Sequence, residues 1–184
     1  MTGVDLYWLP LGAGGHSVRI NGRVYEWFIA RQERRSACAL YHSALVVLLD
    51  DARFVIEVGP VSGRMSHGVV SQGAVGARAA GRLRLFRYEV RCWQDGAIAD
   101  VDEAVESPSR VTHETATARS VLELVGRAPT EVWGRDALGA GEMWNSNSIV
   151  SWLLESAGID AGAIEPPAGG RAPGWHAGLV VARR

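Results

Sequence analysis

The segment at residues 39–60, ALYHSALVVLLDDARFVIEVGP, decides the fold of this chain. Two apolar runs rich in Val, Leu and Ile flank an Asp-Asp-Ala sequence, and the second run ends in Gly-Pro. Branched aliphatic residues favour strands, whereas Asp, Gly and Pro are typical of turns. The segment therefore predicts a long strand, a tight turn and a second strand that pairs with the first as an antiparallel hairpin.

Other segments in the first half of the chain also favour strands and turns. Residues 18–27 hold Asn-Gly between two short β-prone runs, which predicts another hairpin,. Residues 61–81 are rich in Gly, Ser and Ala and predict a surface loop,. Residues 82–93, RLRLFRYEVRCW, alternate between polar and apolar residues, but the alternation changes phase once. This change predicts a strand with a β-bulge near Leu85 and Phe86.

Helical patterns occur only in the second half. Residues 112–125 begin with Thr and place apolar residues at helical spacing, so they predict a helix,. A second helix is predicted to begin within residues 145–148, NSNS, and to end at Gly158,. The last eight residues, AGLVVARR, predict a strand. The predicted fold class is α+β, with an antiparallel sheet and a capped helix packed across it in a single domain of residues 1–184.

The composition excludes several classes of protein. The chain has 184 residues, of which 47% are hydrophobic, so it is long enough for a globular domain with a core,. Its net charge of -1 argues against nucleic-acid binding,. All 19 basic residues are Arg, which excludes a P-loop lysine, a Schiff-base lysine and a Ser–Lys dyad,.

The sequence predicts neither a membrane segment nor a bound cofactor. No signal-peptide pattern opens the chain, and no apolar run approaches the roughly 20 residues of a membrane-spanning helix. We therefore expect a cytoplasmic protein without membrane insertion. The histidines show no metal-ligand spacing with Cys or carboxylates, and the glycines at residues 12–15 lack the dinucleotide-binding pattern, so no metal and no cofactor are expected,.

Two places in the sequence carry candidate catalytic residues. In the predicted hairpin, pairing of the strands brings Glu57 near His42, and a carboxylate there can orient the imidazole. At the start of the predicted second helix, Ser146 offers a hydroxyl where backbone N–H groups can stabilise an oxyanion. The same four residues, NSNS, are also good helix caps, and a cap needs no chemistry.

This order of parts resembles the circularly permuted papain-like fold of the lecithin retinol acyltransferase-like proteins and the PPPDE-type isopeptidases. In these families a histidine strand precedes a helix that opens with Asn-Cys. Here Asn145-Ser146-Asn147-Ser148-Ile149 occupies that motif, with Ser146 in place of the catalytic cysteine. The resemblance implies that His42 is the base, that Ser146 is the nucleophile and that Glu57 lies near the position of the orienting residue.

Three functions follow as alternatives. The first is an acyl-group hydrolase or transferase that acts on an amide, ester or peptide-like bond through Ser146, His42 and Glu57. The second is a non-catalytic papain-like relative whose cleft binds a peptide or lipid-like ligand, and the third is an interaction protein without such a site. The residues predicted to contact a small-molecule or peptide substrate are Trp144, Asn145, Asn147, Arg135 and Arg171. A serine hydroxyl depends on a well-placed base, so the first alternative requires Ser146 and His42 within hydrogen-bond reach.

Overall fold

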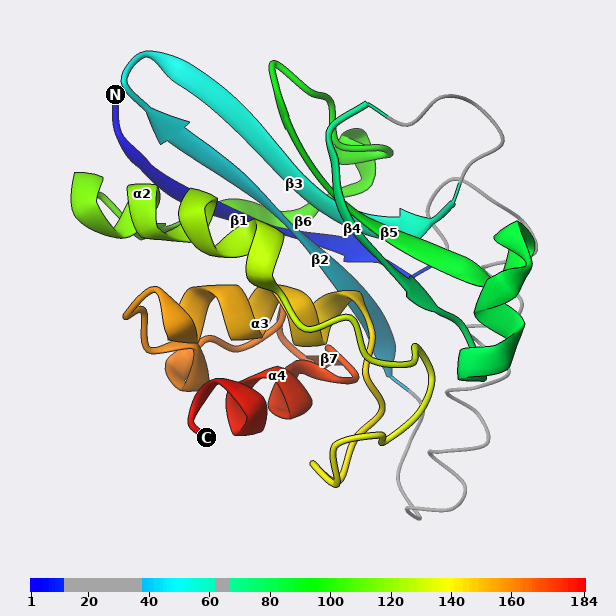
Figure 1. Ribbon diagram of the computed structural model, residues 1–184. Coiled ribbons are helices and arrows are strands. Elements are labelled where there is room, and N and C mark those ends of the chain that lie inside the picture. The colour runs from blue at the N-terminus through cyan, green and yellow to red at the C-terminus, as the bar shows by residue number, and fades with distance from the viewer. Residues whose placement is uncertain (12–37, 62–66) are drawn as a thin grey trace.

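The computed structural model describes residues 1–11, 38–61 and 67–184 (Figure 1). The fold class is α+β, as predicted, and the described residues form a sheet of seven strands in the order β4-β5-β3-β2-β1-β6, with β7 paired to β2. The strands are β1 (Gly3–Pro10), β2 (Ala39–Leu49), β3 (Ala52–Pro60), β4 (Val69–Ala74), β5 (Arg87–Gln94), β6 (Val105–Thr112) and β7 (Gly170–Arg171). The α-helices are α2 (Thr115–Leu124), α3 (Ser146–Ser156) and α4 (Trp175–Ala182). The hairpin predicted at residues 18–27 lies outside the described residues.

The hairpin of β2 and β3 is confirmed. The two strands pair antiparallel from Leu49 opposite Ala52 to Leu45 opposite Ile56. Asp50 and Asp51 form the turn with positive φ angles of 51° and 63°. Aspartate tolerates this left-handed conformation better than most residues, and two such residues in succession give a turn that matches the twist of the strands.

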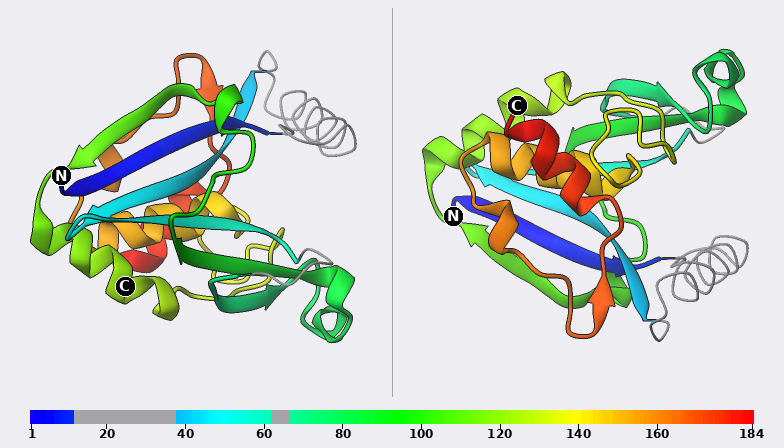
Figure 2. Two further views of the ribbon diagram at one scale, coloured as in Figure 1. Left: turned by 90° about the horizontal axis from the view of Figure 1, so that it is seen from above. Right: turned by 90° about the horizontal axis from the view of Figure 1, so that it is seen from below.

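The three α-helices of the described residues lie on one side of the sheet. Views from above and from below show the strands on one side of the molecule and the helices on the other (Figure 2). The odd-numbered side chains of β2, such as Leu45 and Val47, belong to the main core with α2, α3 and α4. The even-numbered side chains, such as Ala44 and Val46, form a second, small core with Ile98. This division follows from the two-residue period of a strand.

The predicted strand at residues 82–93 begins later than expected. Its first part forms the 3₁₀ helices η1 (Arg78–Arg82) and η2 (Arg84–Phe86), and the strand β5 starts only at Arg87. The phase change in the sequence therefore marks the boundary between a turn and a strand, and the predicted β-bulge is wrong. The predicted loop at residues 61–81 is also partly wrong, since its described part contains β4 and η1.

Both predicted helices are confirmed, whereas the predicted C-terminal strand is wrong. α3 ends before Gly158, which has a positive φ of 90°. The last residues form α4 instead of a strand, because a short apolar run is compatible with a buried helix as well as with a strand,. Across residues 1–11, 38–61 and 67–184, no helix has the length and the apolar character needed to cross a membrane.

Candidate functional site

The NSNS sequence caps α3. The Asn145 side-chain oxygen accepts hydrogen bonds from the backbone N–H groups of Asn147 at 2.9 Å and Ser148 at 3.4 Å. In return, the Ser148 hydroxyl accepts a hydrogen bond from the Asn145 backbone N–H at 3.0 Å. This reciprocal arrangement is a capping box, which pairs N–H groups that a helix leaves without partners,.

Asn147 ties this end of the helix to β2. Its side-chain N–H₂ donates to the carbonyl oxygens of Tyr41 and Pro173, both at 2.9 Å, and its side-chain oxygen accepts from the Ser43 hydroxyl at 2.9 Å. The Asn145 side chain also donates to the Pro173 carbonyl, at 2.8 Å. Both asparagines, which were predicted to contact a substrate, therefore use their side chains in hydrogen bonds within the protein.

The structure does not bring Ser146 and His42 together. Ser43 bonds to Asn147 on the helix side of the sheet, so its neighbour His42 lies on the opposite face,. Ser146 is 5% exposed, and its hydroxyl makes no hydrogen bond within the described parts of the chain. The predicted pairing of nucleophile and base is therefore corrected. His42 lies in the predicted strand, β2. Side chains along a strand point alternately to its two faces, so the His42 side chain points away from α3.

These hydrogen bonds give a direct stability prediction. Asn145→Ala is expected to lower the free energy of unfolding by about 1–2 kcal/mol, because it removes the cap and leaves buried N–H groups without partners. Ser146→Ala, one position later, is expected to change it by less than about 0.5 kcal/mol, because no hydrogen bond is lost. Urea unfolding of both variants measures the two effects. A larger loss in Ser146→Ala than in Asn145→Ala would contradict this account of the cap.

His42 and Glu57 do share a face of the sheet, as predicted, but they belong to a different group of residues. Glu57 forms an ion pair with Arg91 of β5, at 2.6 Å. Burial raises the pKa of Glu57, while Arg91 and the Ala99 backbone N–H oppose this shift. Burial lowers the pKa of His42 to about 4, against the opposing effect of Asp100. The imidazole is therefore neutral at pH 7.

Glu89 is the member of this group whose buried carboxylate lacks hydrogen bonds to described residues. Its side chain is 1% exposed, and neither carboxylate oxygen has a hydrogen-bond partner among residues 1–11, 38–61 and 67–184. Among the described residues, the Arg91 guanidinium forms an ion pair with it, with Nε 3.8 Å from Oε1 of Glu89. Gly59 of β3 is the register partner of Glu89, and a Cβ added to Gly59 would meet nothing within 4 Å. Gly59 therefore places no side chain opposite Glu89, and an added Cβ there would have room.

We refer to His42, Glu57, Glu89, Arg91 and Asp100 as the polar cluster. It contains three carboxyl groups and one guanidinium, and its imidazole is neutral at pH 7, so acidic groups outnumber basic groups in the cluster. Two of its five members, His42 and Glu57, were predicted from the sequence. The sequence also holds a signal for two of the other members. Glu89 and Arg91 alternate with apolar residues in the stretch YEVRCW, which places both on one face of a strand.

The remaining predicted contact residues have structural roles or lie outside the polar cluster. Trp144 is 2% exposed and packs in the main core. The Arg135 guanidinium donates to the Gly76 carbonyl oxygen at 2.8 Å. Arg171 lies in β7, opposite Leu40 in the register. None of these side chains is part of the polar cluster.

Comparisons with protein-family models, curated proteins and solved structures give no match for this chain. Within residues 1–11, 38–61 and 67–184, no group of three or more His, Cys, Asp or Glu side chains is arranged to hold a metal ion. The function is therefore inferred from the contacts and charges of the described residues.

Proposed function

We propose that this protein is a non-catalytic relative of the permuted papain-like enzymes that binds a ligand through its polar cluster. The ligand is a small molecule or a peptide that carries a primary ammonium group. The observation that supports this proposal is the Glu89 carboxylate, which is buried without a hydrogen bond to any described residue and lies opposite Gly59, a residue without a side chain.

The chemistry of Glu89 favours an ammonium ligand. A buried carboxylate without donors is unfavourable, and an N–H donor that also carries positive charge compensates it best. Arg91 does not fill this role, because its shortest contact is to Glu57, at 2.6 Å, and its Nε makes no hydrogen bond. An ammonium group next to Glu89 would supply up to three N–H donors and would balance the excess of acidic groups.

The arrangement at α3 supports binding over catalysis. A serine hydroxyl needs a general base within hydrogen-bond reach, and His42 lies on the other face of the sheet from Asn147 and the start of α3,. Asn145, Asn147 and Ser148 complete a cap that explains their residue types without any chemistry. This favours the non-catalytic alternative over a serine hydrolase or acyltransferase.

Titration calorimetry with ethylammonium chloride tests the proposal. Wild-type protein is expected to bind ethylammonium, and Glu89→Gln is expected to weaken binding by at least about tenfold because it removes the charge. Tetramethylammonium carries the same charge without N–H donors, so it is expected to bind more weakly than ethylammonium. Glu123→Gln, at an exposed position of α2, is the matched control and should leave binding unchanged.

Two outcomes would contradict the proposal. Equal binding of ethylammonium by wild type and Glu89→Gln would mean that the buried carboxylate does not hold the ligand. Covalent labelling of Ser146 by a fluorophosphonate probe, lost in His42→Gln, would restore the catalytic alternative.

A further inference from the structure

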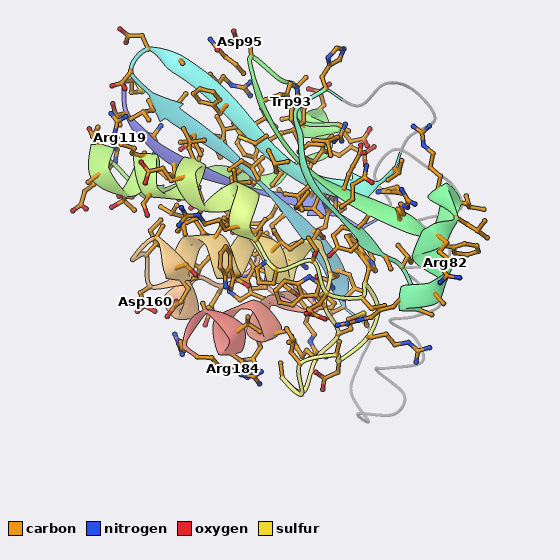
Figure 3. All side chains as sticks on the ribbon, in the orientation of Figure 1. Arg82, Trp93, Asp95, Arg119, Asp160 and Arg184 are labelled. Atoms are coloured by element: carbon orange, nitrogen blue, oxygen red, sulfur yellow. The ribbon has the colours of Figure 1, made fainter. Side chains whose placement is uncertain are left out.

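The segment at residues 78–87, RAAGRLRLFR, projects from the molecule. It comprises η1, η2 and the first residue of β5, and it follows β4. Figures 1 and 2 show it at the far end of β4 and β5, away from α2, α3 and α4. Figure 3 shows the labelled Arg82 at this end, far from Arg184 at the end of α4. We call residues 78–87 the arginine–leucine tip.

The tip exposes large apolar side chains. Leu83, Leu85 and Phe86 are 62%, 84% and 42% exposed. Single exposed apolar residues are normal on protein surfaces, but three within four consecutive residues form a patch. No residue of η1 or η2 is buried, so these side chains do not contribute to the core of the described protein.

The tip also concentrates positive charge. It contains four arginines and no acidic residue, whereas the whole chain has a net charge of -1. The rest of the chain is therefore net negative, and the tip is a locally basic segment. Arg78, Arg82 and Arg87 line a surface hollow of about 430 Å³ together with Gln72. This hollow has the volume and the donors to receive a phosphate group.

The arginines of the hollow retain capacity for an anion. Arg78 forms an ion pair with Glu131 at 3.1 Å. The Arg78 side chain and the hydrogen bond between the two residues are exposed to solvent. The Arg87 side chain donates to the carbonyl oxygens of Gly81 and Arg82. The Arg82 guanidinium makes no ion pair with any residue that the structure describes. An anion in the hollow would therefore gain a charged partner without breaking a buried contact.

We propose that the arginine–leucine tip docks on the surface of an anionic phospholipid membrane. Leu83, Leu85 and Phe86 enter the boundary between the headgroups and the acyl chains, and the arginines bind lipid phosphates. Apolar side chains combined with nearby arginines are the pattern of peripheral membrane-binding segments. This docking is adsorption through a few side chains, and it requires no membrane-spanning helix. It is independent of the ammonium site.

The shape of the tip favours a membrane over a protein partner. Leu85 is 84% exposed on a projecting turn. A rigid protein would need a matching pocket to cover such a side chain, whereas a bilayer is a deformable apolar phase that covers it directly. The negative remainder of the chain would be held away from an anionic surface, which orients the molecule with the tip toward the lipid.

Vesicle co-sedimentation tests this proposal with the full chain. We expect binding to vesicles of phosphatidylcholine with phosphatidylglycerol, little binding to phosphatidylcholine alone, and weaker binding as salt is raised. The double variant Leu83→Ser/Leu85→Ser is expected to lower the partition coefficient by at least about tenfold, because two apolar anchors are lost. Arg82→Gln is expected to lower it by several-fold.

Two matched variants serve as controls. Val101→Ser removes another exposed apolar residue, 41% exposed in η3 (Val101–Glu103), and Arg119→Gln removes an exposed arginine that pairs with Asp50. Both should bind vesicles like wild type. All the substituted side chains lie at the surface, and circular dichroism verifies that each variant is folded.

Three results would overturn the proposal. The first is no binding to phosphatidylglycerol vesicles at low salt. The second is an equal loss of binding in the tip and control variants, because it would show that the tip has no special role. The third is tip-dependent binding to an acidic peptide together with no binding to vesicles, because it would identify a protein partner.

Discussion

Gly178→Ala is expected to lower the free energy of unfolding by about 3 kcal/mol or more, or to prevent folding. Gly178 lies in α4 where this helix crosses α3, and a Cβ at this position would overlap the Ser148 carbonyl oxygen and the Ser151 hydroxyl. The Ser148 oxygen belongs to the backbone and cannot move without displacing a helix. Ser151 also donates to the Trp175 carbonyl at 2.7 Å, so the added methyl group would disturb a buried hydrogen bond.

Gly126→Ala is the matched control for this experiment. Gly126 lies in η4 (Val125–Arg127), and a Cβ there would meet nothing within 4 Å. Alanine restricts the unfolded chain more than glycine, so this variant is expected to keep or slightly increase the stability. Urea unfolding compares the two variants. A change of less than about 1 kcal/mol in Gly178→Ala would contradict the close packing of α4 on α3.

Lowering the pH from 6.5 to 4 is expected to cost about 3 kcal/mol of stability through His42 alone. The pKa of His42 falls from 6.5 to about 4 on folding, because burial disfavours the charged imidazole. Between these values the unfolded chain binds a proton that the folded protein does not bind. The contribution of His42 to the free energy of unfolding therefore has its full value above pH 6.5 and is lost as the pH falls toward 4.

The variant His42→Gln isolates this effect. Burial raises the pKa of Glu57, so this carboxyl contributes with the opposite sign, and it is present in both proteins. The difference in stability between wild type and His42→Gln, measured by urea unfolding, is expected to fall by about 3 kcal/mol from pH 6.5 to pH 4. His113→Gln, at an exposed position, should show no such trend. A constant difference for His42→Gln would mean that His42 is not buried beside Asp100.

The parts of the fold with strong local signals were predictable. The β2–β3 hairpin combines two apolar runs with an aspartate turn, and α3 combines a capping sequence with a glycine stop. In both, the local preference of the residues and the final packing agree. The C-terminal residues lacked such agreement, because an apolar run without capping or turn signals fits a strand and a buried helix alike. In the structure this run forms α4, which packs against α3 with Gly178 at the contact.

The candidate site was less predictable, because it depends on which face each side chain occupies. His42, Glu57 and Ser146 lie in the predicted elements, but Ser43 is the β2 residue that bonds to the helix. A shift of one residue exchanges the two faces of a strand. Glu89 and Arg91 join the polar cluster through pairing of β5 with β3, a contact between segments about thirty residues apart that no local pattern contains,.

A crystal structure of the protein soaked with ethylammonium chloride would show whether Glu89 holds the ammonium group. We expect an ammonium nitrogen within about 3.2 Å of a Glu89 carboxylate oxygen, on the side of Gly59. We also expect Ser146 and His42 to remain on opposite sides of the sheet. No ligand at Glu89 under saturating ethylammonium, or an imidazole of His42 bonded to the Ser146 hydroxyl, would contradict the proposed function.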